Sequence, residues 1–221
     1  MENELKDTDK KYTKTIPDEK ETRFLNIIGT EVSYHDRVIL DREQLKWVIG
    51  VFKKEGKNVG YTGGTYDLLH EGHVKYLEAA KSRCDVLVVG VDSNELARRR
   101  KPDIKNRPIV DLQERLLMLS HIRSVNILTV LDVNEHQDQL IIDILPDVAV
   151  FSKGTKDVTE EKIRKALSQY CGEIVFLEPQ ATTSTTARIR TLAMDGASGL
   201  GRVVTNAIES YLHPNVEEEK K

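Results

Sequence analysis

Two histidines three residues apart, His70 and His73, have the residue type and spacing in this sequence that most clearly indicate chemistry. They follow Gly63 and Gly64 at the predicted start of a helix, so both imidazoles can face one anion. Glycines let backbone N–H groups approach a ligand closely, and a helix start adds partial positive charge. The sequence therefore predicts a phosphate site. The alternatives are a capping role and a metal site, although no third metal ligand is evident nearby.

The elements around this segment alternate between strands and helices, which is typical of an α/β fold with a doubly wound, parallel, five-stranded sheet and flanking helices. We expect strands at residues 58–62, 85–91, 125–131, 147–151 and 173–177. We expect helices at residues 41–55, with Asp41 as N-cap, 72–83, 93–100, 112–124, 136–144, 160–170, with Thr159 as N-cap, 186–194 and 200–212. A turn at Gly63 and Gly64 should end the first strand.

Parallel sheets of this kind bind ligands beyond the carboxyl ends of their strands. The predicted elements place four segments along that edge: residues 63–73, Asp92, residues 152–157 and residues 178–186. The domain predicted from this pattern covers residues 41–195. Residues 1–40 should be a partly disordered extension, because the first 22 are polar and highly charged, and residues 196–221 a helix with a frayed tail.

The bulk composition argues against several classes of partner. The net charge of the 221 residues is −3 and only 5% of them are aromatic, so we expect no nucleic acid partner. The N-terminus has no apolar segment of the kind a signal peptide needs, and the longest apolar runs are only as long as strands. Two isolated cysteines, Cys84 and Cys171, predict ordinary thiols. We therefore expect a cytoplasmic protein with no membrane partner.

The run TGGTYDLLHEGH, residues 62–73, closely resembles the T-x-G-x-F-D-x-L-H-x-G-H signature of the nucleotidylyltransferase (cytidylyltransferase-like) superfamily, with Tyr66 in place of the usual Phe. The resemblance implies a Rossmann-like fold. It extends over residues 41–192 and is most similar to the adenylyltransferase domain of bacterial ADP-heptose synthases. Four further stretches carry it: GVDSNELARRRKP, NRPIVDLQERLLML, LPDVAVFSKG and STTARIR.

The resemblance also implies roles for individual residues. The catalytic residues would be His70, His73 and Lys101, which would contact the phosphates of a nucleotide and stabilise the transition state. The acceptor would be bound by Asp92 and Arg107, and Mg²⁺ would arrive with the nucleoside triphosphate (NTP), with no metal site in the protein itself. The predicted nucleotide-binding residues are Thr62, Gly63, Gly64, Thr65, Tyr66, Asp67, Gly72, Lys153, Gly154, Asp157, Thr183, Ser184, Thr185 and Thr186.

Two departures from the family pattern lie near the predicted sugar-binding side. The family often has Lys-Gly-Gly-Asp after the fourth strand, whereas this chain has an extra residue between Lys153 and Asp157. Asn94 stands where related domains often carry Asp. Because of these two departures, the sequence does not identify the acceptor molecule.

The predicted reaction transfers a nucleoside monophosphate, with ATP as the favoured donor, to a phosphate monoester such as a sugar phosphate, and releases pyrophosphate. One alternative is a CTP-dependent cytidylyltransferase acting on glycerol phosphate or phosphoethanolamine, and another is an FMN adenylyltransferase. A third, of a different class, is a non-catalytic nucleotide-binding scaffold. An NAD-linked oxidoreductase is set aside because no G-x-G-x-x-G follows the first strand. The family suggests a homodimer.

Overall fold

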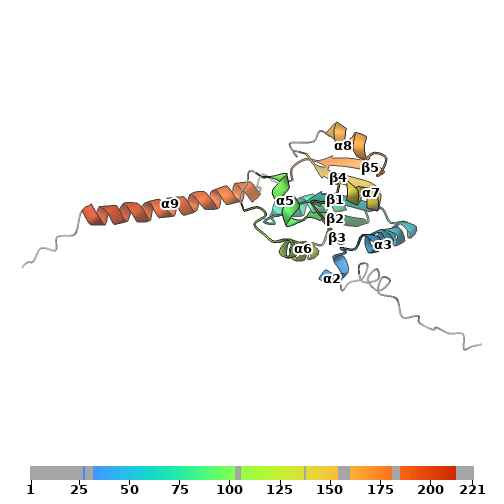
Figure 1. Cartoon of the computed structure of the whole chain (residues 1–221), viewed down its shortest axis with the longest axis horizontal. Helices are drawn as coiled ribbons and strands as arrows, with labels where there is room; N and C mark the ends of the chain where they lie inside the picture. The colour runs from blue at the N-terminus through green and yellow to red at the C-terminus, as the bar shows by residue number, and fades with distance from the viewer. Residues whose placement is uncertain are drawn as a thin grey trace, which may run out of the picture.

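The fold is built on one sheet of five parallel strands in the order β3-β2-β1-β4-β5. The computed structural model describes residues 27, 32–102, 106–136, 138–153, 160–180 and 185–212. The strands are β1 (Val59–Gly64), β2 (Val86–Asp92), β3 (Ile127–Leu131), β4 (Val148–Ser152) and β5 (Glu173–Leu177). Figure 1 shows the sheet with helices on both sides. The predicted doubly wound α/β fold is confirmed.

Eight helices in the described residues accompany the sheet: α2 (Tyr34–Arg37), α3 (Arg42–Lys54), α4 (Glu71–Lys81), α5 (Asn94–Arg100), α6 (Leu112–Ser120), α7 (Gln139–Ile144), α8 (Glu160–Leu167) and α9 (Thr185–Leu212). The Asp41 carboxylate accepts the Gln44 N–H at 2.6 Å, so the predicted N-cap of α3 is confirmed. Thr159 lies outside the described residues. Helix α6 ends four residues earlier than predicted.

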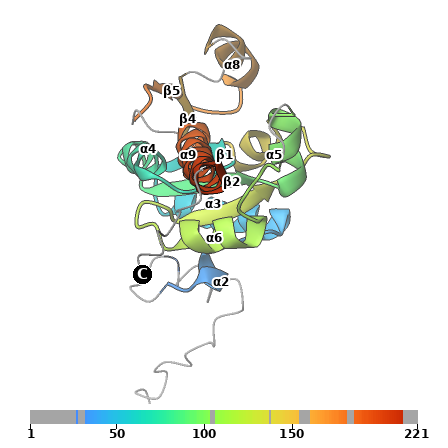
Figure 2. The same cartoon turned by 90° about the vertical axis from the view of Figure 1, so that its left-hand side faces the viewer.

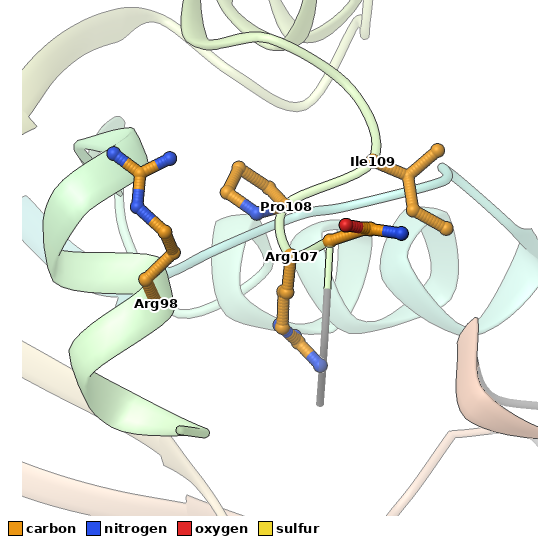
Figure 3. Close-up of a pocket in the computed structure, with 5 residues that line it drawn as sticks. Arg98, Arg107, Pro108 and Ile109 are labelled. Carbon is orange, nitrogen blue, oxygen red and sulfur yellow. The ribbon is translucent and has the colours of Figure 1, made fainter. Parts of the chain in front are cut away.

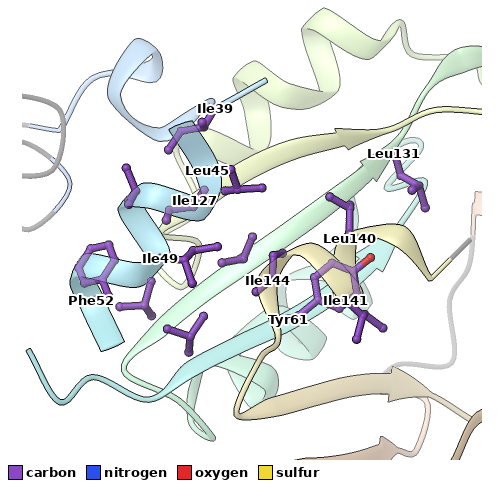
Figure 4. Packing of buried hydrophobic residues seen from close by; sticks show 14 of the residues in the cluster. Ile39, Leu45, Ile49, Phe52, Tyr61, Ile127, Leu131, Leu140, Ile141 and Ile144 are labelled. Carbon is purple, nitrogen blue, oxygen red and sulfur yellow. The ribbon is translucent and has the colours of Figure 1, made fainter. Parts of the chain in front are cut away.

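The core consists of two apolar clusters, one on each face of the sheet. Successive residues of β2 alternate between them, because successive side chains of a strand point to opposite faces. Val86 and Val88 join α3 and α7 in one cluster, which Figure 4 shows from close by. Leu87 and Val89 join α4 and α6 in the other. The sheet is therefore buried between two helical layers, and His70 and His73 follow its central strand β1.

The first strand is longer than predicted, because β1 continues through Gly63 and Gly64 instead of turning there. The two glycines pair with Gly90 and Val91 of β2. A Cβ on Gly63 would lie 2.9 Å from the Tyr61 hydroxyl. The absence of a side chain at Gly63 thus makes room for the Tyr61 ring within the sheet. In the sequence, a glycine with this role cannot be distinguished from a glycine in a turn.

The folded domain begins before residue 41, where the sequence predicted its start. Ile39 is completely buried, and its N–H donates to the Leu128 carbonyl at 2.8 Å. Arg37 donates to the carbonyls of Ile122 and Val125 at 3.2 and 2.7 Å. The segment before α3 is therefore packed against β3. The disorder predicted for residues 1–22 concerns residues outside the described ones.

At the other end of the chain, one helix replaces the two that the sequence predicted. Helix α9 runs through Gly199 and Gly201 for 28 residues. A glycine inside a helix costs about 1 kcal/mol relative to alanine but leaves the hydrogen-bonding pattern intact, so it does not end the helix as proline would. Figures 1 and 2 show α9 running away from the body of the domain. None of the helices in the described residues is both long and apolar enough to cross a membrane.

Candidate active site

The loop between β1 and α4 is held in an unusual backbone conformation. Tyr66 and Leu68 have positive φ values of 54° and 45°, which side-chain-bearing residues adopt rarely. The buried Asp67 carboxylate between them accepts the N–H groups of Ile109 and Val110 at 3.0–3.1 Å. The predicted nucleotide-binding residue Asp67 therefore clamps the loop to residues 109–110.

His70 is the N-cap of α4. Its Nδ1 accepts the Gly72 N–H at 3.1 Å, so Gly72 holds this imidazole in place. Since Nδ1 accepts, the neutral ring carries its proton on Nε2.

His73 stacks on His70, with ring centroids 3.9 Å apart and an interplanar angle of 24°. The Tyr66 ring meets His73 edge to face at 5.5 Å. Burial, followed by the effect of His70, lowers the pKa of His73 from 6.5 to about 4, with Asp67 acting in the opposite direction. His73 is therefore neutral at pH 7. Its buried Nδ1 has no hydrogen-bond partner among the described residues.

The site is braced by a residue that the sequence analysis missed. Arg115 of α6 is completely buried and donates to the carbonyls of Thr65 and Asp92 at 2.7 and 2.8 Å. It also donates to the Asn94 Oδ1 at 2.7 Å and to the Val110 carbonyl at 3.0 Å. The sequence feature that could have indicated this role is the position of Arg115, one residue before Leu116, on the face of the amphipathic helix that packs against the sheet.

Two predicted ligand-binding side chains are already engaged inside the protein. Asp92 is 1% exposed; its Oδ2 accepts the Thr65 hydroxyl at 2.7 Å and its Oδ1 lies 3.2 Å from Arg100. Burial raises the pKa of Asp92, with Arg100 acting against this. Asp92 therefore positions Thr65 and Arg100, and its contact with the acceptor stays a prediction.

Thr62 has internal partners as well. Its buried hydroxyl lies 2.8 Å from the Tyr76 hydroxyl and donates to the Val150 carbonyl at 2.9 Å. Its side chain thus joins β1 to α4 and β4, and its contact with the nucleotide stays a prediction.

The cationic residues at the edge of the sheet have different surroundings. Lys101 is the exposed C-cap of α5, and the neighbouring Arg100 is the residue that reaches the carboxylate of Asp92. Lys153 follows β4 and forms ion pairs with Glu178 at 2.7 Å and Glu160 at 3.9 Å. These pairs raise the pKa of Lys153.

The remaining predicted nucleotide contacts can be placed only in part. Thr185 and Thr186 begin α9, but their side chains are not described. Gly154, Asp157, Thr183 and Ser184 lie outside the described residues.

A cavity of about 510 Å³ lies near the loop between β1 and α4. It is lined by Arg98, Asn106, Arg107, Pro108 and Ile109. Figure 3 shows Arg98 on α5 and Arg107, Pro108 and Ile109 on the segment that precedes α6. Arg107, predicted to bind the acceptor, is in the cavity wall. The cavity wall is joined to the loop before α4 through Asp67, which accepts the N–H of the lining residue Ile109 at 3.1 Å.

No group of three His, Cys, Asp or Glu residues in the described ranges could hold a metal ion. A magnesium ion bound to an NTP needs none, because phosphates and water supply most of its ligands.

Residues 61–193 match the model of the cytidylyltransferase-like family. With this fold, this loop and this match, the chain belongs to that family, and the resemblance seen in the sequence is confirmed. Relatives include the bifunctional protein HldE of Mesorhizobium japonicum, 34% identical over 74% of this chain and 32% of its own length. HldE of Wolinella succinogenes is 34% identical over 69% of this chain and 31% of its own length. The chain spans about a third of the length of these relatives.

Among solved structures, the lipopolysaccharide core biosynthesis protein of Thermoplasma volcanium is similar, with a TM-score of 0.49 and 24% identity over 55% of this chain and 97% of that one. A pantothenate synthetase of Thermus thermophilus has a TM-score of 0.47 and 16% identity over 64% of this chain and 61% of that one.

Proposed function

We propose that this protein is a nucleotidyltransferase that transfers a nucleoside monophosphate from an NTP to a phosphate monoester and releases pyrophosphate. The observation that carries the proposal is the stacked His70–His73 pair at the start of α4, which a short loop connects to the glycine end of β1. Family membership supports the same reaction class.

The proposed step needs no nucleophile from the protein. A phosphate oxygen of the acceptor attacks the α-phosphorus of the NTP, a new P–O bond forms, and the bond to the bridging oxygen of the pyrophosphate breaks. The protein has to align the two reactants and stabilise the negative charge that develops on the departing group. The Nε2–H of His70 and the imidazole of His73 are the groups that would do this.

Cations at the edge of the sheet would complete the phosphate site. Lys101 and Lys153 remain proposed phosphate contacts, and binding would require Lys153 to exchange its carboxylate partners for phosphate oxygens. We add Arg100 to these proposed phosphate contacts. It forms an ion pair with Asp92, and Asp92 also accepts the hydroxyl of Thr65 in the loop between β1 and α4. Mg²⁺ would enter with the triphosphate.

We favour ATP as the donor and a sugar phosphate as the acceptor, since the sequence is most similar to the adenylyltransferase domain of ADP-heptose synthases. CTP with glycerol phosphate or phosphoethanolamine is the second candidate. A cytoplasmic location stays a prediction from composition.

The test is a matrix of turnover assays. The protein is incubated with Mg²⁺, each of four NTPs and a panel of phosphomonoesters, and pyrophosphate release and product mass are measured. We expect pyrophosphate and a nucleoside-diphospho product from one pairing. Tight NTP binding without turnover on any acceptor would instead favour a nucleotide-binding scaffold.

We also propose that the protein is a homodimer formed through α9. Five large apolar residues of this helix are 48–66% exposed: Met194, Leu200, Val203, Val204 and Ile208. Between Gly196 and Ile208 only Arg202 is charged, so a second copy of α9 would meet little repulsion.

A further inference from the structure

Strands β1 and β4 separate at the edge of the sheet where the loop with the two histidines begins. β1 is paired with β2 as far as Gly64 and Val91. Its pairing with β4 ends earlier, at Tyr61 and Ala149, although both strands continue beyond these residues. In the order β3-β2-β1-β4-β5, the chain leaves β1 on one side for β2 and places β4 on the other. Folds of this kind bind ligands at such a reversal of the strand order.

Two hydroxyl groups connect the strands just beyond their last pair. The Val150 carbonyl of β4 lies 2.9 Å from the Thr62 hydroxyl of β1 and 3.1 Å from the Tyr76 hydroxyl of α4. The two hydroxyl oxygens are 2.8 Å apart, so their two protons are shared among three contacts. Thr62 and Val150 are completely buried or nearly so. We call these three groups, Thr62, Tyr76 and the Val150 carbonyl, the hydroxyl bridge.

Tyr76 connects the helix of the two histidines to this bridge. It lies three residues after His73 in α4, so the two side chains share one face of the helix. The Tyr66 ring lies over Gly64, 3.2 Å from where a Cβ would be, and meets His73 edge to face. His73 also stacks on His70. The imidazole of His73 is therefore packed between two rings, one turn before the point where α4 is attached to both strands.

The Tyr76 hydroxyl remains a hydrogen-bond donor at the pH of any ordinary assay. Burial raises its pKa to about 12, with the hydrogen bond to Thr62 acting in the opposite direction. Breaking a hydrogen bond inside a protein leaves polar groups without partners, which is costly. The hydroxyl bridge thus holds the first turns of α4 at a fixed distance from the ends of β1 and β4.

We infer that Tyr76 is a positioning residue for nucleotidyl transfer: its hydroxyl holds the His73 turn of α4 against β1 and β4, so that the imidazole stays in place in the transition state. This inference rests on the proposed function, in which His73 stabilises the charge of the departing group. A displacement of about 1 Å can cost about 10²-fold in rate, so a small tilt of α4 is sufficient to slow the reaction.

The test is the steady-state kinetics of Tyr76→Phe against Tyr34→Phe. Tyr76→Phe keeps the ring, and Thr62 can still donate to the Val150 carbonyl, so the variant should fold, which thermal unfolding checks. The control also removes a tyrosine hydroxyl that joins two elements, since Tyr34 of α2 donates to Gln113 of α6 at 3.2 Å. We expect Tyr76→Phe to lower kcat about 10-fold with the KM of each substrate within about 2-fold, because only the transition state loses a contact. The control should leave all three constants within about 2-fold.

A second measurement does not depend on turnover. The pKa of His73 is followed by NMR titration of the histidine resonances, and His73→Gln identifies its signal. Burial is the largest cause of the lowered pKa, followed by His70, by Asp67 in the opposite direction, and by Arg107. A loosened His73 turn should be less well buried, so its pKa should rise from about 4 towards 6.5 in Tyr76→Phe and stay unchanged in the control.

The two changes together support the inference. A wild-type kcat in Tyr76→Phe, or an equal loss in both variants, refutes it, because the hydroxyl would then serve stability alone. A fall in kcat without a change in the pKa of His73 also refutes it, since Tyr76 would then act by another route. If no pairing of substrates turns over in the wild type, the proposed function fails. The pKa of His73 then decides whether Tyr76 holds this imidazole: a rise in Tyr76→Phe supports that role, and an unchanged value refutes it.

Discussion

The two histidines at the start of α4 have different surroundings at their ring nitrogens. The Nδ1 of His70 is occupied by the Gly72 N–H, so this ring can only donate from Nε2. The Nδ1 of His73 has no partner among the described residues and its ring is neutral at pH 7. A negative charge arriving beside His73 would favour its protonated form, which could then stabilise the leaving group.

Replacing His73 should therefore affect the chemical step. We expect His73→Ala to lower kcat by about 10²–10³-fold, the usual cost of losing one preorganised donor, with an unchanged circular dichroism spectrum. The control is His136→Ala, since the side chain of His136 is 68% exposed and distant in the sequence. Wild-type turnover of His73→Ala would show that this assignment is wrong.

The lowered pKa of His73 also predicts how stability depends on pH. The unfolded chain takes up a proton at His73 near pH 6.5, whereas the folded protein does so only near pH 4. Between these values the unfolded state binds more protons, so the contribution of neutral His73 is complete above pH 6.5 and is lost as the pH falls towards 4. Each pKa unit corresponds to about 1.4 kcal/mol and the two values differ by about 2.5 units, so the loss should not exceed about 3–4 kcal/mol.

Urea unfolding at several pH values between 7.5 and 4 measures this effect. The comparison is with His73→Gln, which has no titrating group at this position and should lose less stability on acidification. Parallel curves for the two proteins would contradict the predicted linkage.

At the scale of elements, α5 and α6 are joined at their N-termini by a side-chain pair. Asn94, the first residue of α5, donates from Nδ2 to the Asp111 carboxylate at 2.6 Å and accepts from Arg115 at its Oδ1. Asp111 is the N-cap of α6, and its backbone and side-chain hydrogen bonds lower its pKa. An amide fits here because it donates and accepts at once, which gives a structural reason for Asn where related domains often have Asp.

Asn94→Asp should therefore destabilise the protein by about 1–3 kcal/mol at pH 7, because the donor to Asp111 is lost and two carboxylates face each other. Chemical denaturation measures the change. The double variant Asn94→Asp/Asp111→Asn restores a donor–acceptor pair and keeps a good N-cap, so it should recover most of the loss. If the double variant is no more stable than Asn94→Asp, the pair is not the cause.

The five strands and the helices between them could be predicted because hydrophobic periodicity marks them, whereas α2 and the single long helix α9 were not predicted. The sequence could not show that Gly63 and Gly64 remain in β1, because a glycine that makes room for Tyr61 looks the same as a turn glycine. The loop with His70 and His73 was predictable from local spacing. Arg115 and the cavity were not, because they depend on contacts between α6, β2 and residues far apart in the chain.

At the scale of the whole molecule, helix α9 exposes apolar side chains that no other described element of the chain covers. A 28-residue helix is about 42 Å long at 1.5 Å per residue, and Figure 1 shows it extending beyond the sheet. Leu200, Val204 and Ala207 are spaced four and three residues apart, as in helices that pair along one seam. The proposed homodimer would bury this seam against a second copy.

The double variant Leu200→Glu/Val204→Glu tests the homodimer. Both side chains are exposed in the single chain, at 66% and 48%, so the substitutions should leave the domain folded. In a dimer they would place four carboxylates in one apolar seam, and burying one unpaired charge costs several kcal/mol. We expect sedimentation velocity to show a dimer for the wild type, a monomer for the double variant, and a dimer for Ser198→Glu, which places its charge on the polar side of α9. A wild type that stays monomeric at about 100 µM would contradict the prediction, since a stable dimer has a Kd well below that concentration.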